Sequence, residues 1–345
     1  MTREDNVRDF DPSQPATTNT LWGLPFHVDD AALVVLPVPW EVTVSYGGGT
    51  ANAPAAVLAA SHQVDLESET YPDAWRKGIA MAPEPEDVRR LNDATRPKAL
   101  EVIDAIAQGN AESARVLLTE VNRACETMVA SVRGEASALL ERGKRVGVLG
   151  GDHSVALGLM QALAERHDDF GILHIDAHSD LRDAYEGFRH SHASIMRNAL
   201  GLPGLSKLVQ VGVRDYCEEE LEVIRGSGEL VQLFSDHSLS RRRFHGETWS
   251  AMTDDIVREL PENVYVSFDV DGLDPSLCPG TGTPVPGGLA YEQALFLVER
   301  LSATERTIMG FDLSEISPSG ERGSEWDANV GARLLYRLSS AALSR

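Results

Sequence analysis

The sequence predicts an α/β fold in which helices cover both faces of a mostly parallel sheet. Short apolar runs typical of buried parallel strands recur along the chain, and stretches with helical periodicity separate them. Acidic and histidine residues cluster directly after several of these runs, where the carboxyl ends of parallel strands commonly form a site. No break in composition and no internal repeat divides the 345 residues. We therefore expect one domain over 31–345, preceded by a polar N-terminal arm over 1–30.

The first half of the chain contains two predicted strands and three predicted helices. The apolar run at 31–38 predicts a buried strand, and the loop after it contains three consecutive glycines at 47–49. Glycines allow a close approach to another backbone or to a ligand, although they are equally typical of a flexible turn. Residues 65–95 carry little structural signal. Helical periodicity covers 54–61, 98–107 and 112–142, and a short strand follows at 146–149.

The second half alternates strands and helices more regularly. Apolar strand-like runs occupy 170–175, 208–213, 264–270 and 307–313. Helices are expected at 155–166, 291–301 and 329–344, while the pattern over 217–260 predicts helix, short strand and helix. Strands that are joined through helices in this way run parallel, and their connecting helices pack on both faces of the sheet.

Charge and composition exclude several classes of function. The formal net charge of −22 argues against nucleic acid as a partner and favours the approach of a cationic substrate. No run of about 18 apolar residues is present, so no membrane span is expected. The three cysteines, Cys125, Cys217 and Cys278, are scattered and form no CxxC pair. This spacing argues for a cytoplasmic protein and against a disulfide framework or a thiolate zinc site.

Two carboxylates end the run at 264–270 and require a counter-charge. Side chains two residues apart on a strand point the same way, so Asp269 and Asp271 are expected side by side. Two buried like charges repel each other strongly. A metal ion between them is the simplest way to remove this repulsion.

Further candidate ligands follow two other strands. Asp176, His178 and Asp180 recur with a period of two after 170–175, and His153 follows 146–149 through a Gly-Gly turn. Each pattern alone is more often a surface loop, but three of them at strand ends favour a metal site. Six oxygen and nitrogen ligands without thiolate suit Mn²⁺, with Ni²⁺, Fe²⁺ or Zn²⁺ as alternatives. The number of ligands fits two ions that share carboxylates and activate water.

Three motifs together resemble a known family. They are Gly-Gly-Asp-His-Ser at 150–154, Asp-Ala-His-Ser-Asp at 176–180 and Ser-Phe-Asp-Val-Asp-Gly-Leu-Asp-Pro at 267–275. With them, the chain is similar to the ureohydrolase superfamily of arginases, agmatinases and formimidoylglutamases over about 31–340. The resemblance implies a three-layer α/β/α sandwich and assembly into a homo-oligomer, either a trimer or a hexamer.

The resemblance also implies a ligand assignment. One metal ion would be held by His153, Asp176, Asp180 and Asp269, and the other by Asp176, His178, Asp269 and Asp271. Asp176 and Asp269 would then bridge the two divalent ions, which the family context makes Mn²⁺ or Ni²⁺.

The implied reaction is hydrolysis of a guanidino compound to urea and an amine or ammonia. His192 matches the family's proton-transferring histidine, with His190 as a neighbouring alternative. Glu315 matches the carboxylate that pairs with the guanidinium. Asp183 and Tyr185 are candidates for the substrate-binding wall.

The substrate is open at this point. The loop at 47–54 departs from the arginine-containing version usual in agmatinases, and 38–45 is most similar to agmatinase-like proteins that act on guanidine or small substituted guanidines. We therefore expect a small guanidine as substrate, with agmatine as the alternative. Two interpretations come from other classes: a non-catalytic metal-binding partner subunit of an active homologue, and an amide deacetylase with a single zinc.

Overall fold

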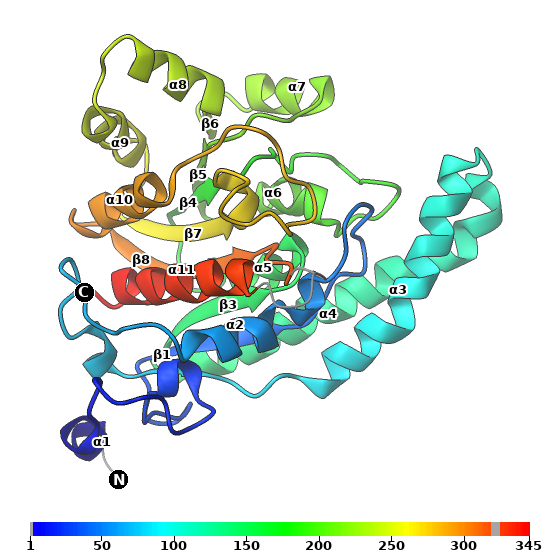
Figure 1. The fold of residues 1–345 in the computed structure, drawn as a ribbon. Helices are drawn as coiled ribbons and strands as arrows, with labels where there is room; N and C mark the ends of the chain where they lie inside the picture. The colour runs from blue at the N-terminus through cyan, green and yellow to red at the C-terminus, as the bar shows by residue number, and fades with distance from the viewer. Residues whose placement is uncertain (1–2, 319–324) are drawn as a thin grey trace.

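Eight parallel strands form one continuous sheet in the computed structural model, which describes residues 3–318 and 325–345 (Figure 1). The strands lie side by side in the order β2-β1-β3-β8-β7-β4-β5-β6. Their bounds are β1 Leu33–Val38, β2 Ile79–Met81, β3 Arg145–Gly150, β4 Phe170–Ile175, β5 Leu205–Val211, β6 Val231–Phe234, β7 Asn263–Asp269 and β8 Thr307–Ser314. The predicted α/β fold with a mostly parallel sheet is confirmed.

Helices form a layer on each side of this sheet. In Figure 1, α2 and α11 run in front of the sheet, and α4 and α5 lie behind it. The helices are α1 Arg3–Asp9, α2 Ala53–Ser61, α3 Glu86–Ala107, α4 Arg115–Glu141, α5 Ala156–Ala164, α6 Ile195–Ala199, α7 Glu218–Gly226, α8 Asp236–Phe244, α9 Trp249–Arg258, α10 Tyr291–Ser302 and α11 Trp326–Ala342. Every residue of β1 and β4 is buried, which explains why these strands read as continuous apolar runs.

The structure differs from the sequence prediction most clearly before residue 98. Residues for which the sequence carried little structural signal form β2 and most of the first three turns of α3. Helix α3 continues through Pro97, which removes one backbone hydrogen bond, because the helix is long and packs along α4 (Figure 1). Residues 217–260 contain three helices, α7, α8 and α9, where the sequence indicated two.

The end of β7 also corrects an expectation. The strand stops at Asp269, and Asp271 lies in the 3₁₀ turn Val270–Gly272. The Asp269 side chain accepts a hydrogen bond from the backbone N–H of Asp271 at 2.8 Å, so the two carboxylates are related by a turn and not by strand alternation. Both remain buried at this edge of the sheet.

The segment before β1 packs on the rest of the chain. Leu21, Trp22, Leu24 and Phe26 are buried, and the Trp22 indole N–H donates to the carbonyl of Ala332 in α11. The division into an arm at 1–30 and one domain at 31–345 remains a proposal. Across residues 3–318 and 325–345, no helix combines the length and apolar character needed to cross a membrane.

A tight backbone crossing connects β1 to the turn after β3. The N–H groups of Gly151 and Asp152 donate to the carbonyls of Val38 and Trp40, at 3.0 and 2.8 Å. A Cβ atom on Gly151 would lie 1.7 Å from the Trp40 carbonyl oxygen. Only glycine fits here without a backbone shift, and this turn places the following Asp152 and His153.

We expect Gly151→Ala to lower the free energy of unfolding by about 3 kcal/mol, because the added methyl group forces the two backbones apart. Gly134→Ala is the matched control, since nothing lies within 4 Å of its Cβ in the middle of α4. There alanine should stabilise the helix by roughly 0.5–1 kcal/mol. Urea unfolding of both variants measures the difference; equal midpoints would contradict the crossing described above.

Candidate metal centre

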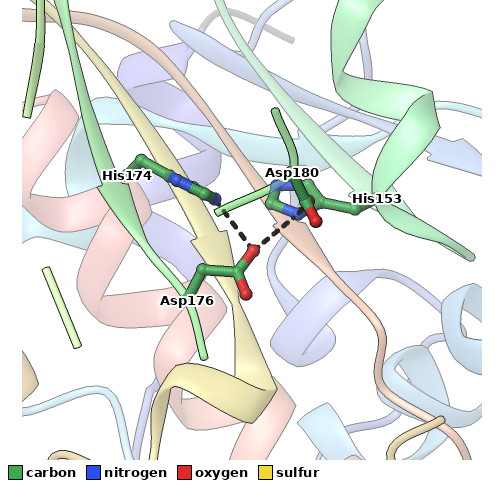
Figure 2. Close-up of side chains that lie close together, drawn as sticks. All are labelled: His153, His174, Asp176 and Asp180. Carbon is green, nitrogen blue, oxygen red and sulfur yellow. Dashed lines mark hydrogen bonds and ion pairs between the residues drawn. The ribbon is translucent and has the colours of Figure 1, made fainter. Parts of the chain in front are cut away.

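The four central strands bring the candidate ligands to one edge of the sheet. Strands β3, β8, β7 and β4 are consecutive neighbours, although they are far apart in sequence. His153 begins the 3₁₀ turn His153–Val155 after β3, Asp269 ends β7, and Asp176 follows β4 directly. Figure 2 shows His153, His174, Asp176 and Asp180 converging on one point.

His153 faces three carboxylates. Its Nδ1 atom lies 3.0 Å from Oδ2 of Asp176, 3.2 Å from Oδ2 of Asp180 and 3.4 Å from Oδ2 of Asp269. Despite these short distances, Nδ1 has no hydrogen-bond partner of acceptable geometry among the described residues. One nitrogen and three carboxylate oxygens therefore surround a common centre, and this nitrogen forms no hydrogen bond to any of the three oxygens.

A second group lies beside the first and shares Asp176 with it. His178 Nδ1 is 3.0 Å from Oδ2 of Asp271 and 3.5 Å from Oδ1 of Asp176. Backbone N–H groups hold the Oδ1 atom of each carboxylate: His178 donates to Asp176 Oδ1 at 2.6 Å, and Ala177 donates to Asp271 Oδ1 at 3.0 Å. The Oδ2 atoms of Asp176 and Asp271 remain directed at the histidines.

Crowding of buried carboxylates is visible in their pKa values. Burial, together with the neighbouring Asp271 and Asp176 carboxylates, raises the pKa of Asp269 well above its usual range. Burial and the nearby Asp176 carboxylate raise the pKa of Asp180 to about 6. Each of these groups would ionise more readily if a positive charge lay between them.

The other nitrogen of His153 is held by a buried relay. The Ser267 hydroxyl donates to Oδ2 of Asp312 at 2.7 Å and lies 2.8 Å from His153 Nε2. A hydroxyl has only one proton, so toward His153 it accepts, and Nε2 carries the proton. In the neutral form of His153, which is the form that binds a metal ion, the Nδ1 lone pair then points at the three carboxylates. A neutral imidazole with carboxylate oxygens around it is a donor set that suits a divalent cation, so these residues fit a metal ion.

A cavity of about 170 Å³ opens from this cluster. Glu315, His192 and Tyr185 line it together with His153, His178, Asp180, Asp269 and Asp271. The structure thus brings most of the predicted site residues to one space. Asp176 lies in the cluster itself, fully buried and outside the cavity lining. Asp183 lies outside both: its side chain is 79% exposed, lies 3.7 Å from Arg197 and is absent from the cavity lining.

Glu315 is buried and lines the cavity, in an uncommon backbone conformation with φ of 64°. Its Oε1 accepts the backbone N–H of His153 at 2.9 Å, and its own N–H donates to the Gly151 carbonyl at 2.9 Å. Burial, followed by the nearby Asp152 carboxylate, raises the pKa of Glu315 well above its usual range. A cation entering the cavity would stabilise its ionised form.

His192, and not His190, lines the cavity. Its ring meets the Tyr185 ring edge to face at 6.0 Å, and its Nδ1 lies 3.4 Å from the Thr43 hydroxyl. Burial is the largest cause that lowers the pKa of His192, to about 3. His192 is therefore neutral near pH 7.

The loop after β1 forms one cavity wall and is anchored by α3. Arg96 donates to the carbonyl of Val42 at 3.0 Å and to that of Val44. The side-chain oxygen of Asn92 accepts a hydrogen bond from the backbone N–H of Glu41 at 2.8 Å. Ser45, on the same loop, lines the cavity. Of the two alternatives left open for the glycines at 47–49, Gly47 shows the close approach to another backbone, because a Cβ on it would lie 2.9 Å from the Gly282 carbonyl oxygen.

Several functional residues escaped the sequence analysis. Ser267 and Asp312 lie inside strands and not after them, so a search of strand ends misses them. The cavity lining also includes residues without a motif signal: Ser45, Arg182, Ala193, Asp215, Tyr216, Glu220 and Thr283.

Comparison with known proteins gives a consistent picture. A profile of the arginase family matches residues 31–340. An N(1)-aminopropylagmatine ureohydrolase of Thermus thermophilus is 36% identical over 310 residues, 89% of each chain. The agmatinase of Bacillus subtilis is 27% identical over 309 residues, 90% of each chain. The crystal structure of agmatine ureohydrolase of Thermoplasma volcanium superimposes with a TM-score of 0.71 and 25% identity, covering 99% of this chain and 98% of that one.

The raised carboxyl pKa values predict how metal binding depends on pH. The folded metal-free protein keeps protons on Asp180 and Asp269 where the unfolded chain has lost them. The contribution of Asp180 to stability therefore falls as pH rises from 3.8 through about 6. A metal ion competes with these protons. We expect Mn²⁺ to raise the melting temperature more at pH 7.5 than at pH 5.

Differential scanning calorimetry with Mn²⁺ and with EDTA measures this effect at both pH values. Asp183→Asn is the control, since its carboxylate lies outside the cavity, and it should show the same metal-induced increase as the parent. An increase that is larger at pH 5 would contradict the electrostatic description of the cluster.

Proposed function

The chain belongs to the arginase family, and from this membership we propose that it hydrolyses a small guanidino compound to urea and an amine or ammonia. Relatives at 36% and 33% identity are named ureohydrolases, which are hydrolases acting on carbon–nitrogen bonds, and this chain is a hydrolase of that kind. The observation that carries the proposal is the buried Glu315 facing the same cavity as the His/Asp cluster.

Two metal ions are proposed for the cluster. His153, Asp176, Asp180 and Asp269 would hold one, and Asp176, His178, Asp269 and Asp271 the other. Ions bound there would lower the pKa of water, so that hydroxide would be available near neutral pH. The short distances from His153 and His178 to these carboxylates support the assignment.

Glu315 is proposed to bind the guanidinium. A planar cation pairs well with a carboxylate in a bidentate manner, and ionisation of Glu315 becomes favourable once that cation is in the cavity. Its bonds to the backbone of His153 and Gly151 would fix the substrate relative to the cluster.

His192 is proposed to move the proton. Hydrolysis forms a carbon–oxygen bond from water and breaks a carbon–nitrogen bond, and the leaving nitrogen needs a proton. Because His192 lines the same cavity as the cluster, its imidazole would accept the proton that the attacking water gives up and deliver it to the leaving amine. The Tyr185 ring beside it restricts the orientation of the imidazole.

The cavity accommodates a small substrate. Its volume of about 170 Å³ is sufficient for guanidine or a guanidine with a short substituent. The wall formed by Ser45 and the close packing of Gly47 on Gly282 limit the space at one side.

Agmatine is the second candidate. Asp215 lines the cavity, is exposed, and has no side-chain partner among the described residues. Such a carboxylate could bind a distal ammonium group, and relatives of this chain are named agmatinase and N(1)-aminopropylagmatine ureohydrolase.

The identity of the metal, the compartment and the assembly are also proposed. The oxygen and nitrogen ligands suit Mn²⁺ or Ni²⁺. The free cysteines are compatible with a cytoplasmic enzyme, and we propose a homo-oligomer, either a trimer or a hexamer.

We expect urea release from guanidine or methylguanidine when the metal-free enzyme is loaded with Mn²⁺ or Ni²⁺. Agmatine, arginine and 4-guanidinobutyrate complete the panel, and Glu315→Gln serves as the inactive control. Urea from agmatine alone would replace the first candidate with the second. A protein that binds two ions and releases no urea from any guanidine would favour the interpretation as a non-catalytic partner subunit. A protein that binds one ion per chain would favour the interpretation as an amide deacetylase.

His192→Ala should reduce turnover roughly 10²–10⁴-fold while metal content stays at the parental value, because only proton transfer is lost. His190→Ala is the matched control and should retain activity, since His190 does not line the cavity. The role moves to His190 if the two variants show the opposite pattern.

A further inference from the structure

A buried polar row crosses the centre of the sheet directly behind the ligand cluster. His174 in β4 is paired in register with Gln210 in β5 on one side and with Ser267 in β7 on the other, and Ser267 is paired with Asp312 in β8. All four side chains are fully buried. Polar groups inside a sheet are costly unless hydrogen bonds satisfy them, so this row needs an explanation.

Hydrogen-bond directions identify the protonated nitrogen of His174. The Ser179 backbone carbonyl can only accept, so the Gln210 atom 2.7 Å from it is the amide nitrogen Nε2. The Ser179 hydroxyl, 2.9 Å from Gln210 Oε1, agrees with this orientation. Nε2 of Gln210 also lies 3.0 Å from His174 Nδ1 and donates to it. Nδ1 is therefore the unprotonated nitrogen.

His174 is consequently a donor to Asp176. A neutral imidazole has one N–H group, which must be Nε2, and this atom lies 2.8 Å from Asp176 Oδ2 (Figure 2). Neither ring nitrogen of His174 then has a free lone pair for a metal ion. Asp176 Oδ1 is held separately by the backbone N–H of His178. Both oxygens of this carboxylate are thus fixed by donors of the chain itself.

We propose that the polar row of Gln210, His174, Ser267 and Asp312 is a positioning layer for the metal centre. On one side, Gln210 keeps the proton of His174 on Nε2, and this N–H group orients the Asp176 carboxylate. On the other, the Ser267–Asp312 relay directs the Nδ1 lone pair of His153. The inference rests on the proposed metal site, but not on the identity of the substrate.

His174→Leu and His174→Gln separate a positioning donor from a ligand. Leucine removes the N–H group at similar bulk, and the apparent affinity for Mn²⁺ should fall about 10–100-fold. Glutamine offers an amide N–H near the same position, and affinity should stay within a few-fold of the parent. Calorimetric titration of the metal-free proteins with Mn²⁺ measures both affinity and stoichiometry.

Two results would overturn the proposal. A folded His174→Leu protein that binds Mn²⁺ as the parent does would show that the donor is dispensable. Equal losses in the leucine and glutamine variants would show that the imidazole itself is required, as for a ligand. His62→Leu is the control, because His62 bonds only the Thr20 carbonyl, remote from the cavity, and its affinity should be unchanged.

Gln210→Met gives an independent test should the leucine variant not fold. It removes the donor to His174 Nδ1, so the imidazole can adopt either neutral form. We expect weaker Mn²⁺ binding and ¹⁵N shifts of His174 in the metal-free protein that report mixed forms; the parental shift and affinity would overturn the proposal. If the parent protein binds no Mn²⁺, the proposed function itself is contradicted. If the parent binds Mn²⁺ and the variants bind it equally well, only the positioning proposal is contradicted.

Discussion

Electrostatic repulsion among buried carboxylates is the constraint on which the rest of the structure depends. Asp176, Asp180, Asp269 and Asp271 are all nearly inaccessible to solvent at the carboxyl edge of the sheet. Two of them have raised pKa values, and three direct an oxygen at one unpartnered histidine nitrogen. Such a cluster needs compensating positive charge at neutral pH, because desolvated like charges repel strongly.

The fold delivers this cluster by placing distant segments on neighbouring strands. β3, β8, β7 and β4 are consecutive in the sheet, so the residues that follow them meet although they span positions 153 to 315. Two kinds of support then hold the side chains. Backbone turns such as the crossing at Gly151 set the position of each residue, and the polar row inside the strands sets the direction of its polar atoms.

Sequence reasoning predicted the α/β fold and brought together every proposed metal ligand, because short motifs at strand ends are local signals. It failed where the cause is tertiary. Helix α3 begins at Glu86 and passes through Pro97 because it packs along α4, which no local pattern reports. His174 and Asp312 look like ordinary strand residues until the register pairs them with Gln210 and Ser267. Asp183 has a favourable position in sequence, yet its side chain points toward Arg197 outside the cavity.

Anomalous diffraction from crystals grown with Mn²⁺ tests the central claim most directly. We predict two peaks, one adjacent to His153 and Asp180 and one adjacent to His178 and Asp271, with Asp176 and Asp269 in contact with both. His174 should contact neither ion. A single peak, no peak in the cluster, or an ion bound to a His174 nitrogen would contradict the claim.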